Sequence, residues 1–209
     1  MSAFAYPVAL TLSGRPCLVV GGGAVAARKV DALVEAGARV TVVSPWLCTA
    51  LLALAADGHF RWWPREYAAG DAEGYFLAIV ATDDRSVNAG VAREARAQGV
   101  LVNCADDPAH CDFVLPAVVR RGPLTVAVST GGASPFMARL VREEIEALLP
   151  EDYAALVQVV AEARRTLRDR GLSVDAERWR AAVDAELRGL VAAGRADEAH
   201  SRLLARLGA

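Results

Sequence analysis

The 209-residue sequence lacks the features that mark several large classes of protein. Lysine occurs only at Lys29, but arginine is plentiful, so the scarcity of lysine excludes nothing. The net charge of −2 gives the chain no general attraction to nucleic acid or to an anionic membrane surface. No apolar run reaches the roughly 18 residues that a membrane span requires. The first residues also lack the basic segment and long apolar stretch of a secretory signal. We therefore predict a cytoplasmic protein that binds neither nucleic acid nor a membrane.

Cysteine is scarce and irregularly spaced. The four residues are Cys17, Cys48, Cys104 and Cys111. Cys17 and Cys104 fall inside strand-like runs, where a free cysteine behaves as a small apolar residue. A metal site built from Cys104, His110 and Cys111 is the alternative, but there is no CxxC pair and no second cluster. We expect no disulfide framework and no metal bound by the protein.

Apolar runs alternate with helical patterns over the first half of the chain. Residues 17–22 form a short apolar run that stops at glycine, as a buried parallel strand does, and residues 24–36 place their apolar positions on one helical face. Strands are expected at 17–22, 39–44, 60–66, 75–83 and 100–106, with helices between them at 24–36, 47–56 and 86–98. This alternation predicts an α/β fold with a Rossmann-type, doubly wound parallel sheet.

The pattern changes after about residue 112. Two strand-like runs follow with only residues 120–123 between them, and they would leave exposed edges without a partner. Ser134 followed by Pro135 is typical of a helix start, and Pro150 should end that helix. We predict three parts: a dinucleotide-binding domain at 1–112, a small α+β dimerisation segment at 113–150 and a helical C-terminal tail at 151–209, broken near residues 171–173.

The turn after the first strand is the first candidate site. It reads Gly21-Gly22-Gly23-Ala24-Val25-Ala26, a GxGxxA pattern. Gly21 allows a tight turn, Gly23 lets the backbone approach a pyrophosphate, and Ala26 permits close packing of the helix on the strand. The helix N-terminus, with Ala24 and Val25, offers N–H groups to the phosphates. The alternative is a glycine turn without a ligand, but the strand before it and the helix after it favour a dinucleotide site.

The end of the second strand departs from the usual dinucleotide fingerprint. Where an acid would bind the ribose hydroxyls, this chain has Ser44-Pro45-Trp46. A serine can still hydrogen-bond a ribose, and no arginine stands there to hold a 2′-phosphate. We therefore include Ser44, Pro45 and Trp46 among the cofactor contacts and expect NAD rather than NADP.

Polar residues follow the central strand at Thr82, Asp83 and Asp84. Ligands of open α/β sheets bind beyond the carboxyl ends of the strands, so Thr82 and Asp83 are expected to line the nicotinamide side of the site. The alternative is that Asp83 or Asp84 caps the following helix. The two interpretations are compatible.

The next strand ends in Asn103-Cys104-Ala105-Asp106-Asp107-Pro108. Asp107 before Pro108 is typical of a turn. Asp106 leaves the strand toward the crevice, where a carboxylate can act as a general base with a pKa tuned by partial burial. Asp106 is therefore our candidate for proton transfer.

A loop of hydroxyl and glycine residues, Ser129-Thr130-Gly131, precedes the helix that starts at Pro135. Such a loop is suited to an anion, and an ordinary turn with a helix cap is the alternative. Four arginines lie near it in the sequence: Arg120, Arg121, Arg139 and Arg142. They would suit a polycarboxylate ligand, although solvated surface arginines are common.

Four segments of the chain, in this order and spacing, resemble the siroheme synthase N-terminal domain family, that is, precorrin-2 dehydrogenases, some of which are also sirohydrochlorin ferrochelatases. The resemblance covers roughly residues 6–170. The segments are YPVALTLSGRPCLVVGGGAVAARKVDALVEAGARVTVVSP, ATDDRSVN, NCADDP and LPAVVRRGPLTVAVSTGGASPFMARLVREEIEALLP.

The resemblance implies an NAD-dependent oxidation of precorrin-2 to sirohydrochlorin by a homodimer with paired central segments, with a tetrapyrrole cleft that the helical tail helps to form. Asp106 matches the family's key aspartate. Some members carry a phosphoserine in the loop, at the position of Thr130. The sequence ends at Ala209 without the methyltransferase domain of the fused siroheme synthases, so we expect a stand-alone dehydrogenase. The substrate contacts expected on this basis are Asn103, Arg120, Ser129, Thr130, Gly131 and Arg139.

Three functions are compatible with these residues. In the leading hypothesis, an oxidoreductase, NAD accepts a hydride from the reduced macrocycle and Asp106 takes the accompanying proton. In the second, a ferrochelatase, the same aspartate removes pyrrole N–H protons while Fe²⁺ enters the macrocycle. In the third, a non-catalytic dinucleotide sensor uses the helical tail to reach a partner and needs no carboxylate at Asp106.

Overall fold

The computed structural model describes residues 6–105 and 107–209. The chain forms two compact units, Met1–Leu115 and Pro116–Ala209. The further boundary near residue 150 stays a prediction. None of the helices in the described ranges combines the length and apolar content needed to cross a membrane.

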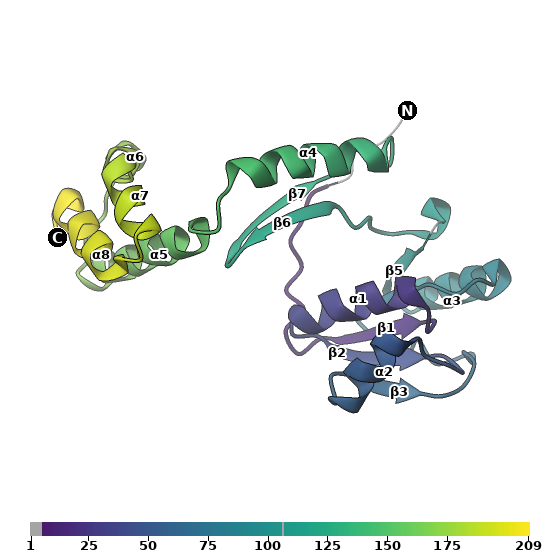
Figure 1. Cartoon of the computed structure of the whole chain (residues 1–209). Helices are drawn as coiled ribbons and strands as arrows, with labels where there is room; N and C mark the ends of the chain where they lie inside the picture. Colours follow the sequence, from purple (N-terminus) through teal and green to yellow (C-terminus); the bar gives the residue numbers. More distant parts are fainter. Residues whose placement is uncertain (1–5, 106) are drawn as a thin grey trace. The chain divides into compact units, whose positions relative to one another are not determined.

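The N-terminal unit is built on a five-stranded sheet with the order β3-β2-β1-β4-β5 (Figure 1). All neighbouring strands are parallel. The strands are β1 (Pro16–Val20), β2 (Arg39–Val43), β3 (Arg61–Trp63), β4 (Leu77–Val80) and β5 (Leu101–Cys104). The predicted Rossmann-type sheet is confirmed, and the strand at 60–66 is at its edge, ending before Pro64 as expected for a residue without an N–H.

The register of the sheet brings the ends of four strands together. Val20 of β1 pairs with Val43 of β2 on one side and with Val80 of β4 on the other, and Val80 pairs with Cys104 of β5. The segments after these strands therefore leave the sheet at the same edge. The chain order reverses between β1 and β4, which is where ligands bind in sheets of this kind.

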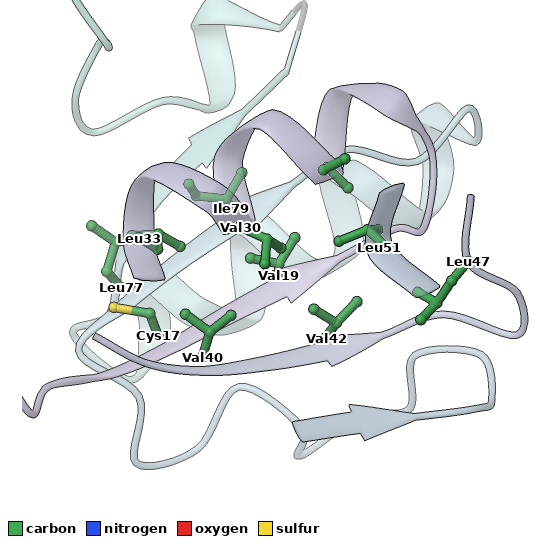
Figure 2. Close-up of a cluster of buried hydrophobic side chains, with 12 residues drawn as sticks. Cys17, Val19, Val30, Leu33, Val40, Val42, Leu47, Leu51, Leu77 and Ile79 are labelled. Atoms are coloured by element: carbon green, nitrogen blue, oxygen red, sulfur yellow. The ribbon is translucent and has the colours of Figure 1, made fainter. Parts of the chain in front are cut away.

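Helices cover both faces of this sheet. They are α1 (Ala24–Glu35), α2 (Thr49–Ala56) and α3 (Arg85–Ala97), with a 3-10 turn, η1, at Pro108–His110. Along β1, Cys17 and Val19 pack under α1 and α2, whereas Leu18 and Val20 pack on the opposite face with α3. Figure 2 shows the first cluster, in which Val19 lies among side chains from α1, α2 and the neighbouring strands. Continuous apolar strands are required because both faces are buried.

The C-terminal unit begins with an antiparallel hairpin, β6 (Ala117–Arg121) and β7 (Leu124–Val128), followed by α4 (Pro135–Leu148). Ser134 caps α4, because its hydroxyl accepts from the N–H of Met137 at 3.2 Å. The predicted Ser134-Pro135 helix start is confirmed.

Four helices complete the second unit: α5 (Tyr153–Asp169), α6 (Ala176–Ala182), α7 (Ala185–Ala192) and α8 (Ala196–Leu207). They share a core that includes Leu187 and Leu203, both fully buried. The predicted break after α5 occurs at Gly171, which has a positive φ of 69°. The helical tail is therefore a packed bundle with its own apolar centre.

Candidate functional site

Gly21 makes the turn after β1 possible. Its φ is +123°, and a Cβ atom there would lie 2.3 Å from the backbone oxygen of Ala81. Its N–H donates to the oxygen of Val43 at 3.0 Å, so the turn is bonded to β2. Any side chain at this position would both strain the backbone and collide with the chain after β4.

Gly22 is required for a reason that the sequence pattern did not indicate. A Cβ atom on Gly22 would lie 1.9 Å from the backbone oxygen of Trp46 and 2.6 Å from the hydroxyl of Ser44. The N–H of Cys48 donates to the oxygen of Gly22 at 2.8 Å. The turns after β1 and β2 therefore touch through Gly22, and this close approach is part of the fold.

Gly23 differs from the two glycines before it. A Cβ atom there would meet only the edge of the Trp46 ring, at 3.9 Å, and its φ of −81° suits any residue. Gly23 is also the N-cap of α1 and provides no side-chain cap, so the first-turn N–H groups are available to a ligand. The space beside Gly23 and these N–H groups fit the pyrophosphate of a dinucleotide. Ala24 and Val25 lie in that first turn, as predicted.

Ser44, Pro45 and Trp46 follow β2 at the same edge. Ser44 is buried, and its hydroxyl donates to the oxygen of Trp46 at 2.6 Å. This internal bond competes with the predicted contact between Ser44 and a ribose. Trp46 is 56% exposed beside Gly23, and Pro45 is exposed as well. Their contacts with the cofactor stay predictions.

Of the two aspartates after β4, Asp84 caps α3 and Asp83 is exposed to solvent. Asp84 caps α3: its carboxylate accepts from the N–H groups of Ser86 at 2.8 Å and Val87 at 3.2 Å. A hydrogen bond from the Ser86 hydroxyl, together with these N–H groups, holds the pKa of Asp84 below its usual range. Thr82 donates from its hydroxyl to the amide oxygen of Asn88 at 2.6 Å. The carboxylate of Asp83 is left exposed, as a residue lining the site would be.

After β5 the structure describes Asn103 and Asp107, whereas Asp106 lies outside the described residues. Asn103 is buried, and its amide donates to the oxygen of Phe113 at 2.9 Å. The N–H of Ala105 donates to the oxygen of Val80 at 2.8 Å, so the sheet continues to the residue before Asp106. Asn103 thus anchors the returning chain, and its contact with a substrate stays a prediction.

Asp107 forms a pair with His110 that the sequence pattern did not predict. Its carboxylate lies 2.7 Å from Nδ1 of His110, and both side chains are about one-third exposed. This hydrogen bond holds the pKa of Asp107 below its usual range. The spacing of three residues across a proline-initiated turn was the available signal for the pair.

The thiols near this loop are engaged with the backbone. Cys111 accepts from the N–H of Cys104 and donates to its oxygen, both at 3.2 Å. Burial raises the pKa of Cys104 to about 11, which opposes the thiolate form that metals bind. Within residues 6–105 and 107–209, no group of three or more His, Cys, Asp or Glu side chains is placed to hold a metal ion.

The loop at Ser129–Gly131 is closed by its own hydrogen bonds. Thr130 Oγ1 donates to the oxygen of Ser134 and accepts from its N–H, both at 3.0 Å, and the N–H of Gly131 donates to Ser129 Oγ at 3.2 Å. These bonds are those of a turn and a helix cap, which was one of the two alternatives. A role of Ser129, Thr130 and Gly131 in binding substrate stays a prediction.

The four arginines near that loop differ in their contacts. Arg121 donates to the oxygen of Leu149 at 2.8 Å, and Arg142 is paired with Glu143 and Glu146 of its own helix. Arg120 lies on β6 opposite Thr125, and Arg139 is exposed on α4. Arg120 and Arg139, the two predicted to contact substrate, therefore stay candidates, whereas Arg121 and Arg142 support the unit itself.

The sheet, its topological switch point and the open glycine turn define a dinucleotide-binding protein of the Rossmann type. A family model described as "Putative NAD(P)-binding" matches residues 8–117, and one described as "Sirohaem biosynthesis protein central" matches residues 121–148.

Comparisons with individual proteins give a narrower assignment. The siroheme synthase of Methylococcus capsulatus is 42% identical over 200 residues, covering 95% of this chain and 42% of that protein. That of Nitrosococcus oceani is 42% identical over 203 residues, covering 96% and 43%. The chain therefore spans less than half the length of these relatives. The structure titled "SirC, precorrin-2 dehydrogenase" is 30% identical, with a TM-score of 0.76, and 95% of this chain covers 98% of it.

The chain belongs to the NAD(P)-binding family of siroheme biosynthesis proteins that includes SirC. The resemblance inferred from the sequence is confirmed.

Proposed function

We propose that the chain oxidises precorrin-2 to sirohydrochlorin with NAD. The observation that carries the proposal is the open turn at Gly23. Two neighbouring glycines are needed by the fold, whereas the third leaves space beside the uncapped first turn of α1, which fits a pyrophosphate. The match to SirC, which is named a precorrin-2 dehydrogenase, over nearly its whole length supports the choice of substrate.

The oxidation removes a hydride and a proton from the macrocycle. NAD, when bound, supplies the hydride acceptor. The backbone at Gly21–Gly23 and the first turn of α1 hold its pyrophosphate, and Asp83 lines the nicotinamide side. Asp106 accepts the proton, because it follows Ala105, whose N–H bonds to Val80 at the edge of the sheet where the cofactor binds.

NAD rather than NADP is proposed as the oxidant. The segment Ser44-Pro45-Trp46 after β2 carries no arginine to pair with a 2′-phosphate. Trp46, more than half exposed, offers an apolar surface beside the turn instead. The substrate side is assigned to residues with hydroxyl, amide and guanidinium groups: Asn103, Arg120, Ser129, Thr130, Gly131 and Arg139.

A homodimer is part of the proposal. Large apolar side chains are exposed on α4, among them Phe136 at 70%, Leu140 at 37% and Leu148 at 75%. Exposed apolar residues gathered on one helix are typical of an interface. They lie within residues 113–150, which we assign to dimerisation, and we place the enzyme in the cytoplasm.

The test is anaerobic incubation of the purified chain with precorrin-2 and either NAD or NADP, followed by absorbance of the macrocycle. We expect sirohydrochlorin to form with NAD, at a rate that depends on enzyme concentration, and more slowly with NADP. No conversion with either cofactor, by a folded protein, would contradict the proposed function.

Metal insertion is the second candidate, because the relatives matched at 42% identity are named siroheme synthases. The macrocycle nitrogens would supply the metal ligands, and Asp106 would take the pyrrole N–H protons. Adding Fe²⁺ or Co²⁺ to the product of the first reaction tests this. Metallation no faster than in a control without protein would remove this candidate and leave the dehydrogenase proposal unaffected.

A further inference from the structure

An arginine reaches the carboxyl edge of the sheet from β3. Val43 of β2 pairs with Trp63 of β3, so the segments after these two strands leave the sheet at the same edge. The backbone oxygen of Trp63 accepts from the N–H of Ser44 at 3.2 Å and from the N–H of Arg65 at 2.8 Å. Ser44 and Arg65 are distant in the sequence, but their backbones meet at one carbonyl group.

This position concerns the choice of cofactor. In sheets of this type an acid after the second strand binds the 2′-hydroxyl of NAD, and an arginine nearby accommodates the 2′-phosphate of NADP. The segment Ser44-Pro45-Trp46 carries neither group. Ser44 is also engaged within the protein, because its hydroxyl donates to Trp46 and its backbone oxygen accepts from Nε1 of Trp62 at 2.9 Å. Arg65 is therefore placed to supply a guanidinium that the segment after β2 lacks.

The guanidinium of Arg65 is already bound. Its Nη1 and Nη2 each donate to a different carboxylate oxygen of Asp71, both at 2.6 Å. Nη1 also donates to the backbone oxygen of Glu66 at 2.9 Å, and Cζ lies 5.0 Å from the centre of the Trp63 ring. Paired hydrogen bonds from one arginine to one carboxylate are among the strong ion pairs of proteins. The two nitrogens that would bind a phosphate are thus occupied.

Asp71 is held in place by the protein. Its Oδ2 also accepts from the N–H of Ala68 at 2.8 Å, and its side chain is only 10% exposed, whereas that of Arg65 is 45% exposed. The hydrogen bonds from Arg65 hold the pKa of Asp71 below its usual range, so the carboxylate is ionised at neutral pH. A second anion at Arg65 would have to displace this carboxylate and would be repelled by it. Such repulsion is a common source of specificity.

We propose that Asp71 sets a preference for NAD over NADP by holding the guanidinium of Arg65. The proposal rests on the proposed dinucleotide site at Gly21–Gly23. NAD has a hydroxyl at the 2′ position and makes no demand on Arg65, whereas the 2′-phosphate of NADP must compete with Asp71. Asp71 is then a positioning residue that acts through Arg65. If the pair only stabilised the loop after β3, its loss would cost stability without changing the choice of cofactor.

The test measures binding of NAD and NADP, which differ only in the 2′-phosphate, by calorimetric titration into the full chain. The readout is the ratio of the two Kd values. We expect the wild type to bind NAD more tightly. Asp71→Asn keeps the shape of the side chain and removes its charge, so the ratio should shift toward NADP by about tenfold or more, because the released guanidinium can bind the phosphate. Asp71→Ala, which offers Arg65 no acceptor, should shift the ratio in the same direction.

Two further variants are the controls. Arg65→Gln/Asp71→Asn has no guanidinium to release and should show the ratio of the wild type. Asp112→Asn breaks a similar pair, in which Arg96 Nε lies 2.8 Å from Asp112, beside β5 at the other edge of the sheet. It should leave the ratio unchanged. Thermal unfolding of each variant confirms that it is folded, and a gain of affinity for NADP cannot result from lost stability.

The outcomes separate this inference from the proposed function. A wild type that binds NAD, with folded Asp71→Asn and Asp71→Ala variants that show the same ratio, would overturn the inference and leave the dinucleotide site intact. An equal shift in Asp112→Asn, or a wild type that binds NADP as tightly as NAD, would also overturn it. A wild type that binds neither cofactor would contradict the proposed function and this inference with it.

Discussion

The hydroxyl of Ser44 donates to the backbone oxygen of Trp46 at 2.6 Å, and Gly22 lies against both atoms. This contact joins the turn after β2 to the turn after β1. The surface proposed to bind the cofactor therefore depends on Gly22, which has no room for a side chain. The neighbouring Gly23, by contrast, faces open space. Substitution of Gly22 should therefore act mainly on stability, and substitution of Gly23 mainly on cofactor binding.

Gly22→Ala should destabilise the protein. Its Cβ atom would lie 1.9 Å from the Trp46 oxygen, so the turn after β2 must move, and overpacking of this kind costs about 1–3 kcal/mol. Denaturant unfolding measures the change. Gly90→Ala in α3 is the control, because nothing lies within 4 Å of the added Cβ and alanine favours a helix. Equal stability of Gly22→Ala and the wild type would contradict the contact.

Gly23→Val should leave the protein folded, with some loss of stability because valine is a poorer N-cap than glycine, and should weaken NAD binding by about tenfold or more. The backbone conformation at Gly23 suits valine, but the side chain would fill the space beside the first-turn N–H groups of α1. Calorimetric titration of NAD into the variant gives the affinity. Unchanged affinity would remove the argument that the phosphates bind at this turn.

Substituting the exposed apolar residues of α4 should dissociate the proposed dimer. Phe136→Gln with Leu140→Gln removes two large apolar side chains that are 70% and 37% exposed. Sedimentation over a range of concentrations should then show mainly monomer. Leu52→Gln on α2, where the side chain is 48% exposed outside the dimerisation segment, is the control and should behave as the wild type does. A wild type that is monomeric at every concentration would refute the dimer.

The pair of Asp107 and His110 predicts a pH dependence. Because the hydrogen bond lowers the pKa of Asp107 in the folded protein, its stabilising effect is present above the ordinary aspartate range. The effect is lost as the pH falls through the lowered pKa. His110→Gln should raise the pKa of Asp107 and move acid unfolding to a higher pH, whereas His59→Gln, an exposed histidine on another loop, should do neither. Carbon NMR of the aspartate carboxyl groups and acid titration by circular dichroism measure the two effects.

The sequence predicted those parts of the fold that depend on local pattern. Strands such as β1 are apolar on both faces, and Ser134-Pro135 marks the start of α4 whatever surrounds it. The role of Gly22 could not be predicted, since it depends on how closely the turn after β2 approaches in space. For the same reason the pattern left Asp83 and Asp84 as alternative caps, and only the structure shows that Asp84 is the cap.

Asp106 and Asp107 are neighbouring carboxylates, and Asp106 is the proposed proton acceptor. Asp106→Ala should lower NAD-dependent formation of sirohydrochlorin by about 10²–10⁴-fold, the usual contribution of a general base. Its affinity for NAD should change little, because the phosphates are assigned to Gly21–Ala26, away from the loop after β5. Initial rates under saturating NAD, together with a calorimetric titration of the cofactor, separate the two effects.

Asp107→Ala is the matched control, one residue along the same loop. Asp107 already bonds to His110, so its removal should cost stability at neutral pH and affect turnover much less. A proton acceptor must be ionised and within reach of the substrate. The carboxylate of Asp107 is instead hydrogen-bonded to His110 within the loop. Wild-type turnover in Asp106→Ala, with turnover abolished in Asp107→Ala, would show that Asp107 is the proton acceptor instead and that His110 orients it.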